Sequence, residues 1–262
     1  MTASALPRLA RRLLGPCVFV AALAVWQAWA ASEDSFLVPT VTAVAARAWD
    51  VWPSGDFLVD IVATLKRLAA GYLLGAGIGV AAGLVLGSSR AVRRTFEPLQ
   101  EFLRSLPAIA VVPAAVVIFG LGDTTRIAVI AFAVCFPVLV NTVQGVRAVP
   151  AETRDTAAML HVGPAELIVR IYARAALPSI VAGLRVALAV GLIVTVLAEF
   201  AVANGDGIGR YIVLQQTQYD YPAVYGGIVF LGLLGSALNG LFRLAEARAL
   251  AWHHGAAGAS ER

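Results

Sequence analysis

Six apolar stretches, most of them close to 20 residues long, recur along this 262-residue chain. About 20 apolar residues are what an α-helix needs to cross the hydrocarbon core of a bilayer. Sixty per cent of all residues are hydrophobic and 14% are charged, which leaves too little polar surface for a water-soluble globule of this size. The sequence therefore predicts an all-α membrane protein with six transmembrane helices. We expect the spans at residues 13–31, 67–86, 105–119, 126–143, 178–200 and 223–242.

The positions of the basic residues predict how these spans are oriented. Cytoplasmic segments of membrane proteins carry an excess of Arg and Lys. Of the 20 such residues, 14 fall on the two terminal segments and the loops assigned to the inside, five on external stretches or helix ends, and one, Arg185, within a span. Both termini are therefore expected to face the cytoplasm.

The first span and the segment after it differ from the rest of the chain. Residues 13–31 follow three arginines, which favours an anchor with its N-terminus inside. The triplet Ala28-Trp29-Ala30 also has the form of a signal-peptide cleavage site, so a cleaved leader is the competing interpretation. An amphipathic helix is expected at residues 39–52 on the outer side. The expected division is an N-terminal span with an external segment over 1–57, a transmembrane domain over 58–246 and a cytoplasmic tail over 247–262.

Glycines recur at every fourth position of the second span. Residues four apart lie on one face of a helix, and a face without side chains lets another helix backbone approach closely. The stripe predicts a helix-packing seam, and a moving or substrate-lining face is the alternative. Its members are Gly71, Gly75, Gly79, Gly83 and Gly87.

Prolines and polar side chains interrupt several of the spans. Proline frees backbone carbonyls, which a membrane tolerates only where protein or a watery cavity satisfies them. We expect Pro98 to break the polar stretch before the third span, and Pro113 to interrupt that span. A broken helix is typical of a transport path, although a kinked structural helix fits the pattern equally well. Candidate path residues are Ser105, Pro107, Pro113, Asn141 and Glu199.

Two ionisable residues lie inside the fifth span, Arg185 near its inner end and Glu199 near its outer end. Charged side chains within a bilayer are costly and usually face protein or water. They can also extend along the helix so that the charged group reaches the interface. Both interpretations are open for these two residues.

A polar, helical island separates the fourth and fifth spans. From Glu166 onward the apolar residues recur at helical spacing, while Glu166, Arg170 and Arg174 fall four apart on another face. Residues 155–160 form a second helix-compatible run, and His161-Val162-Gly163-Pro164 between the two is a turn signal. The island is therefore expected to be a helix, a turn and a second helix.

Residues 154–178 resemble the cytoplasmic coupling loop of permease subunits of type I ABC importers. That loop reads Glu-Ala-Ala, three residues, Gly, then a spacer that ends in Leu-Pro. Here Asp155-Thr156-Ala157 stands at Glu-Ala-Ala, His161 at the usual Gly, and Leu177-Pro178 at the end. Asp keeps the negative charge, and His tolerates the left-handed conformation better than most residues. Gly163 offers an alternative position for the turn.

The resemblance extends to Thr64-Leu65-Lys66-Arg67 before the Gly-rich helix, and to Glu199 with the Gly-rich loop after it. Within the superfamily the chain is most similar to the nitrate, sulfonate and taurine permeases. This implies a permease of the bacterial inner membrane that imports a small anion such as a sulfonate, taurine or nitrate. A permease for a vitamin precursor is the alternative. An ion-coupled secondary transporter is the alternative from another class of protein.

The same resemblance implies which partners the chain works with. They are a second copy of the chain, two cytoplasmic ATP-binding subunits and an external solute-binding protein. The loop at residues 152–178 would contact the ATP-binding subunit. The implied coupling residues are Asp155, Thr156, Ala157, His161, Gly163, Leu167, Ile168, Ile171, Leu177 and Pro178.

Several chemistries have no motif in the sequence. No GxxxxGK[ST] phosphate loop occurs, so ATP hydrolysis is expected on a separate subunit and not on this chain. Three histidines and two cysteines are too few and too scattered for a catalytic or zinc site. We therefore expect no catalytic residues, metal or cofactor, and no nucleic-acid partner.

Overall fold

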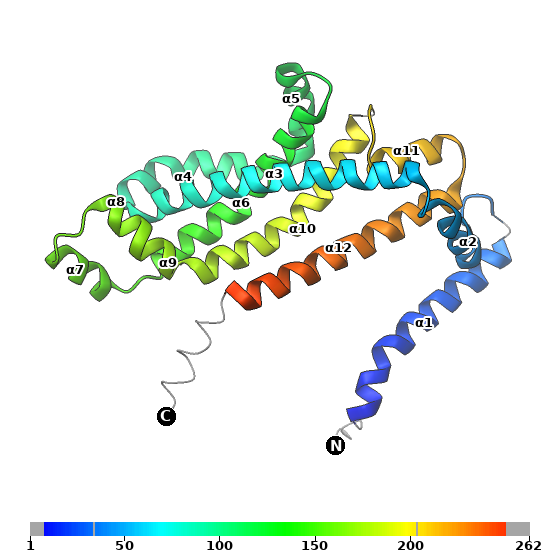
Figure 1. The fold of residues 1–262 in the computed structure, drawn as a ribbon, viewed down its shortest axis with the longest axis horizontal. Coiled ribbons are helices and arrows are strands. Elements are labelled where there is room, and N and C mark those ends of the chain that lie inside the picture. Colours follow the sequence, from blue (N-terminus) through cyan, green and yellow to red (C-terminus); the bar gives the residue numbers. More distant parts are fainter. Residues whose placement is uncertain (1–7, 34, 203, 250–262) are drawn as a thin grey trace. The chain divides into compact units, whose positions relative to one another are not determined.

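The computed structural model describes residues 8–33, 35–202 and 204–249, and all regular secondary structure in these ranges is helical (Figure 1). The prediction of an all-α protein is confirmed. The α-helices are α1 (Arg8–Glu33), α2 (Val41–Val51), α3 (Gly55–Ser88), α4 (Arg90–Ser105), α5 (Val112–Phe119), α6 (Asp123–Arg147), α7 (Ala151–Met159), α8 (Pro164–Glu166), α9 (Ala173–Ala175), α10 (Leu177–Ala201), α11 (Ile208–Thr217) and α12 (Tyr221–Ala249). A 3-10 helix, η1 (Ala108–Val111), precedes α5, and a π-helix, η2 (Leu167–Tyr172), joins α8 to α9.

Five helices in the described ranges are long and apolar enough to cross a membrane. They are Gly15–Glu33 within α1, Gly55–Ser88, Asp123–Arg147, Leu177–Ala201 and Tyr221–Arg248 within α12. The sixth expected crossing corresponds to α4 followed by η1 and α5, which pass the same test only as a pair bent by 93°. In Figure 1, α5 accordingly turns away from the direction of α4.

The third span differs from the sequence prediction in where it breaks. The backbone is extended at Leu106 and Pro107, between α4 and η1, because a residue that precedes proline is disfavoured in a helix. Pro113 does not interrupt a helix. It lies in the first turn of α5, where the missing N–H removes no helical hydrogen bond. Pro98 was expected as a break but lies inside α4, which continues past it without that one backbone bond.

The chain forms two compact units. Of the described residues, the first contains those up to Leu58 together with Tyr211–Leu231, and the second contains Val59–Arg210 together with those from Gly232 onward.

In the first unit, Thr40 caps α2 by accepting a hydrogen bond from the Ala43 amide at 3.2 Å, and α2 corresponds to the amphipathic helix expected at 39–52. Phe57 is buried against the rings of Tyr211 and Phe230, each with ring centres 5.0 Å from its own. Edge-to-face aromatic pairs of this kind hold the unit together.

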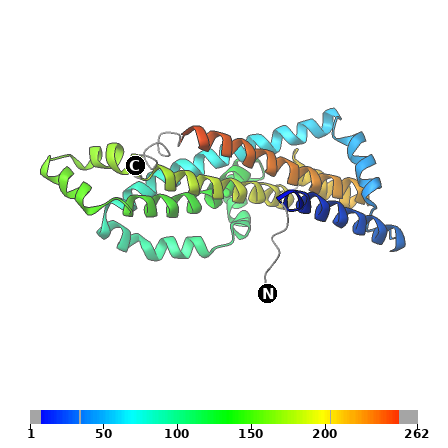
Figure 2. The same ribbon diagram turned by 90° about the horizontal axis from the view of Figure 1, so that it is seen from below.

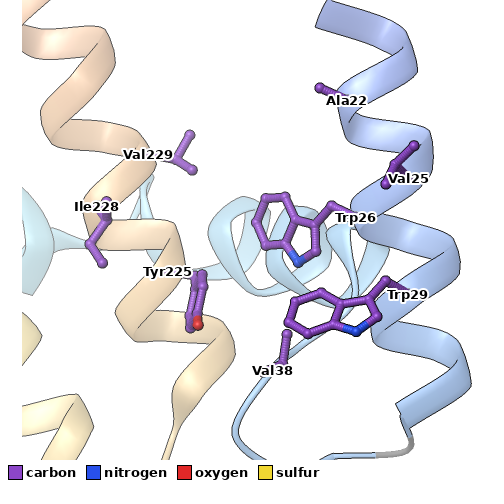
Figure 3. Close-up of a pocket in the computed structure, with 8 residues that line it drawn as sticks. All are labelled: Ala22, Val25, Trp26, Trp29, Val38, Tyr225, Ile228 and Val229. Carbon is purple, nitrogen blue, oxygen red and sulfur yellow. The ribbon is translucent and has the colours of Figure 1, made fainter.

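An apolar cavity of about 760 Å³ also lies within the first unit. Figure 3 shows Trp26 and Trp29 of α1 and Tyr225 of α12 around it. The rings of Trp26 and Tyr225 lie 5.8 Å apart between their centres. Aromatic residues that the sequence places far apart thus come together on one surface of this unit.

The core of the second unit is built on α6. Val129, Ile130, Val134 and Val138 are fully buried there, and they pack with apolar residues of α3, α5 and α10. Figure 2 shows these helices from a second direction, with the segment α7–α9 projecting beyond the ends of α6 and α10. This core positions the groups described next.

Candidate functional site

The glycine stripe of α3 lies against α6 along its whole length. A Cβ atom built on Gly71 would lie 2.6 Å from Cβ of Ile130, and one built on Gly87 would lie 2.7 Å from Cβ of Val146. Gly75, Gly79 and Gly83 meet Val134, Val138 and Thr142 in the same way. The opposing residues of α6 are also four apart, so glycine on one helix faces a branched side chain on the other at five successive levels.

Gly77 shows that the contact belongs to one face only. A Cβ atom built there would meet nothing within 4 Å, although Gly77 lies in the same helix two residues from Gly75 and Gly79. Glycine is thus required for close approach at the stripe, and no contact requires it at Gly77.

A buried ionic network lies between α3, α6 and α10. Glu199 of α10 has no solvent exposure. Its carboxylate accepts hydrogen bonds from Arg67 Nη1 at 2.8 Å, Thr64 Oγ1 at 3.0 Å and the Gly209 amide at 2.9 Å. Arg67 also donates from Nε to Asp123 Oδ1 at 2.7 Å. Each buried charge is therefore met by an opposite charge and by hydrogen bonds, as burial of charged groups requires.

Arg126 completes the network from α6. Its side chain is only 2% exposed and donates to Asp123 Oδ1 at 2.9 Å. It also donates to the backbone carbonyls of Val202 and Asn204, and to Asn204 Oδ1 at 3.0 Å. Its Nε atom has no hydrogen-bond partner among the described residues. Arg126 thus ties α6 to the segment that follows α10.

That segment closes over the network with its backbone. The Gly207 amide donates to Asp60 Oδ1 at 2.7 Å, and the Ile208 amide donates to Thr64 Oγ1 at 2.9 Å. Gly207 has a φ of 141°, and a Cβ atom there would lie 2.5 Å from Cδ of Glu199. Only glycine satisfies both the backbone angle and the available space. The Gly-rich run after α10 therefore serves to cover a buried carboxylate.

These positions correct part of the sequence analysis. Glu199 does not extend to the membrane interface, because its carboxylate is buried against Arg67 and Thr64. Arg67 lies inside α3 and not at a helix end, while Arg126 lies in the first turn of α6, and both are buried members of the network. Arg185 is 44% exposed and lies 3.7 Å from Glu246, so of the two ionisable residues in the fifth span only Glu199 is fully enclosed.

The loop between α6 and α10 has the expected order of helix, turn and helix. After α7, His161 adopts a left-handed conformation with φ of 55°. The Val162 amide donates to the Ala157 carbonyl and the His161 amide to the Ala158 carbonyl, each at 3.0 Å. This is the Schellman arrangement, in which the left-handed position is usually glycine. Gly163 has φ of −64°, so the turn does not depend on it.

The apolar residues of the loop divide between two environments. Leu167, Ile168 and Ile171 are half-buried and pack on a cluster formed by this chain's own Val146, Val149, Tyr172, Ala176 and Ile180. Met159, Leu160 and Val169 are instead exposed by 78%, 72% and 66%. The exposed apolar surface of the loop is thus carried by residues that the sequence did not single out.

The other expected coupling residues lie at the two ends of the loop, on α7 and at the start of α10. Asp155 and Thr156 are exposed on α7, while Ala157 is buried at 4%. Leu177 and Pro178 begin α10, and Pro178 occupies its first turn.

Two of the five candidate path residues, Asn141 of α6 and Glu199 of α10, lie far apart along the axis of α10. Asn141 lies where Gly183 of α10 approaches α6, and Glu199 is 16 residues further along α10, about 24 Å away at 1.5 Å per residue. Ser105 and Pro107 are exposed at the break after α4, and Pro113 is exposed on α5. The role of these five residues in a transport path therefore stays a prediction.

Comparison with known proteins identifies what this arrangement of helices belongs to. The sequence model of the family described as "binding-protein-dependent transport system inner membrane component" matches residues 75–250. The chain belongs to this family of permeases. The resemblance that the sequence analysis drew from the coupling loop and from Glu199 is confirmed at the level of the family.

Three relatives illustrate the range of the family around this permease. It is 29% identical to SsuC of Bacillus subtilis, a permease protein named for transport of aliphatic sulfonates, over 92% of this chain and 87% of the relative. It is 30% identical to the bicarbonate transport permease CmpB of Synechococcus elongatus, over 68% and 64%. It is 27% identical to the nitrate import permease NrtB of Leptolyngbya laminosa, over 85% and 82%. The permease is thus a multi-pass membrane subunit of the ABC transporter family.

Proposed function

We propose that this permease, paired with a second copy, forms the membrane pathway of an ATP-driven importer in the bacterial inner membrane. Separate ATP-binding subunits would dock on residues 152–178 from the cytoplasm, and an external solute-binding protein would deliver the solute. Membership of the family supports this assembly. The excess of basic residues on the assigned inner segments supports an orientation with both termini in the cytoplasm.

The observation that carries the coupling role is the exposed apolar surface of the loop. Met159 and Leu160 end α7 with most of their surface uncovered, and Val169 lies exposed on η2. Large apolar side chains exposed on a cytoplasmic loop favour a protein contact. A few buried anchors carry most of the energy of a helix seated in a groove. We infer that these three side chains are the anchors, while Leu167, Ile168 and Ile171 fasten the loop to its own chain.

Asp155 has a supporting role in this proposal. It lies on the exposed surface of α7, in the half of that helix that leads to Met159. Asp155 is the fifth of the nine residues of α7, so it lies beyond the first turn, where a negative charge stabilises a helix through its dipole. Asp155→Lys instead reverses a charge on the exposed surface of the loop, and we expect it to reduce binding of the ATP-binding subunit without removing an apolar anchor.

The docking proposal is tested by co-purification. Leu160→Ser in the full permease should reduce the amount of ATP-binding subunit recovered at least about tenfold, as loss of an interface anchor does. Leu121→Ser is the matched control, because Leu121 is exposed by 69% in the turn between α5 and α6, outside the loop. Undiminished recovery with Met159, Leu160 and Val169 each changed to Ser would contradict the docking role.

We infer further that the solute is a small anion. The three relatives described above carry names for sulfonates, bicarbonate and nitrate, which are all small anions at neutral pH. Purification of the whole complex with its solute-binding protein, followed by mass spectrometry of the bound solute, is the test. A neutral or cationic solute would overturn this part of the proposal and leave the docking role untouched.

A further inference from the structure

An arginine-lined cavity lies where four elements of the second unit meet. Its volume is about 390 Å³. The end of α3 contributes Gly87 and Ser88, and the other lining residues are arginines from α4, α6 and α7. These are Arg90, Arg93, Arg94, Arg147 and Arg154. Five positive charges from three helices therefore surround one hollow, and no acidic residue is among the described residues that line it.

None of these arginines is neutralised by the described part of the protein. The ion pairs in that part involve Arg47, Arg67, Arg104, Arg126, Arg170 and Arg185. The cavity arginines form no side-chain hydrogen bond or ion pair with any described residue. The positive charges of arginines around one cavity repel one another. The repulsion costs more free energy where the helices that carry the arginines cannot move apart.

The helices that carry most of these arginines are packed together beneath the cavity. A Cβ atom on Gly87 would lie 2.7 Å from Cβ of Val146, the residue before Arg147, so the ends of α3 and α6 are in close contact. Leu86, Leu139 and Val143 form a buried cluster that also packs against Val92 of α4. Three of the four elements are thus locked together, which fixes the backbone positions from which the arginines of α4 and α6 reach the cavity.

The start of α4 adds to the positive potential. Ser89 caps this helix, and Arg90 and Arg93 lie in its first turn, which contains no acidic residue. The N-terminus of a helix carries a partial positive charge and favours anions. Basic residues placed there are unfavourable by themselves and become favourable when an anion binds between them.

We propose that this cavity binds a phosphate group or a related oxyanion. Guanidinium groups match tetrahedral and planar oxyanions with paired hydrogen bonds, which is why clustered arginines are typical of such sites. The group can come from the headgroup of an anionic lipid or from a free anion in the cytoplasm. An excess of inner basic residues accounts for arginines on this side of the membrane, but it does not gather five of them around one cavity.

The site has a consequence for the loop. Arg154 lies on α7, directly before Asp155 of the loop motif. A bound oxyanion would bridge α7 to the ends of α3, α4 and α6, and so would hold the first loop helix in place. Anion binding in the cavity therefore regulates how rigidly α7 is held for contact with the ATP-binding subunit. This regulation rests on the docking role proposed above and adds to it.

The test measures binding to the full-length permease and needs no transport. Native mass spectrometry measures retained phosphatidylglycerol against phosphatidylcholine, and thermal unfolding measures the response to inorganic phosphate. The double variant Arg93→Gln/Arg147→Gln should weaken the binding at least about tenfold, since each lost guanidinium removes charge-assisted hydrogen bonds. The control Arg104→Gln/Arg243→Gln removes two positive charges outside the cavity and should change it less than about twofold. If the first double variant does not fold, Arg154→Gln replaces it, because Arg154 is exposed on α7.

Each outcome decides the proposal. Stabilisation by phosphate alone supports a site for a free anion, and selective retention of phosphatidylglycerol supports a site for a lipid headgroup. Equal losses in the cavity and control variants would mean that diffuse charge binds the anion, and the proposal would be wrong. It would also be wrong if neither anion bound. Loss of the ATP-binding subunit from the cavity variant would in that case mean that the arginines belong to a protein interface.

Discussion

A methyl group added at Gly79 should disrupt the packing of α3 on α6. A Cβ atom there would lie 2.6 Å from the backbone oxygen of Cys135 and 2.9 Å from Cβ of Val138. Ordinary contacts begin near 3.4 Å, so the two helices would have to separate by roughly 0.8 Å at this level. The obstacle is a backbone atom and a branched side chain, and neither can rotate away.

The cost follows from the neighbouring levels of the stripe. Because Gly75 and Gly83 are packed just as tightly, a separation at Gly79 also loosens the contacts one turn above and below. Overpacking by a single methyl group costs about 1–3 kcal/mol. We therefore expect Gly79→Ala to lower the free energy of unfolding by about 2 kcal/mol, and Gly79→Leu to prevent folding.

Gly77→Ala and Gly77→Leu are the matched controls, since nothing lies within 4 Å of a Cβ atom at Gly77. The assay is unfolding of each purified variant in a rising fraction of sodium dodecyl sulfate, followed by helical circular dichroism. We expect the Gly77 variants to unfold within about 0.5 kcal/mol of the wild type. Equal losses for Gly77→Ala and Gly79→Ala would refute the reasoning, because the stripe would then contribute nothing through close approach.

Three further predictions concern the network, the loop and the orientation. Glu199→Gln should cost about 2–3 kcal/mol in the same unfolding assay, because Asp123 is then the one charged partner that Arg67 keeps among the described residues. An unchanged stability would argue against the network. His161→Val should cost about 1–2 kcal/mol while His161→Gly should cost nothing, since φ at His161 is 55°; thermal unfolding of both variants checks this, and equal effects would contradict it. In a background without Cys17 and Cys135, an impermeant thiol reagent should label Asp50→Cys only from outside and His161→Cys only from inside, and the reverse pattern would overturn the proposed orientation.

Local patterns in the sequence predicted the helices well where hydropathy changes sharply. The fourth and fifth spans were expected at 126–143 and 178–200, and the helices cover Asp123–Arg147 and Leu177–Ala201. The second span was expected to begin at Arg67, but α3 begins at Gly55. Hydropathy alone places the charged first half of α3 outside the membrane. It cannot show that Arg67 is buried, because the carboxylate that pairs with Arg67 belongs to Glu199, 132 residues further along the chain.

In the loop, too, the sequence predicted what depends on neighbouring residues and missed what depends on distant ones. The turn at His161 was readable, because the Schellman arrangement involves only residues 157–162. Which apolar residues stay exposed was not readable, because that depends on where α6 and α10 lie. Leu167 and Ile171 are covered by Val146 and Ile180 of those helices, and no sequence pattern marks Met159 or Leu160 as uncovered.

The contact between α3 and α6 also limits how these two helices can move. At five levels along this contact, a glycine of α3 faces a branched side chain of α6. The five levels span 16 residues, about 24 Å. Small sliding would drive each side chain onto helix backbone, so the next free register is a full step of four residues, about 6 Å away. The pair must therefore move as one rod that joins the buried ions near Arg67 to the arginine cavity near Gly87. A rearrangement of the second unit would therefore have to take place outside this pair, for example at the extended link of Leu106 and Pro107.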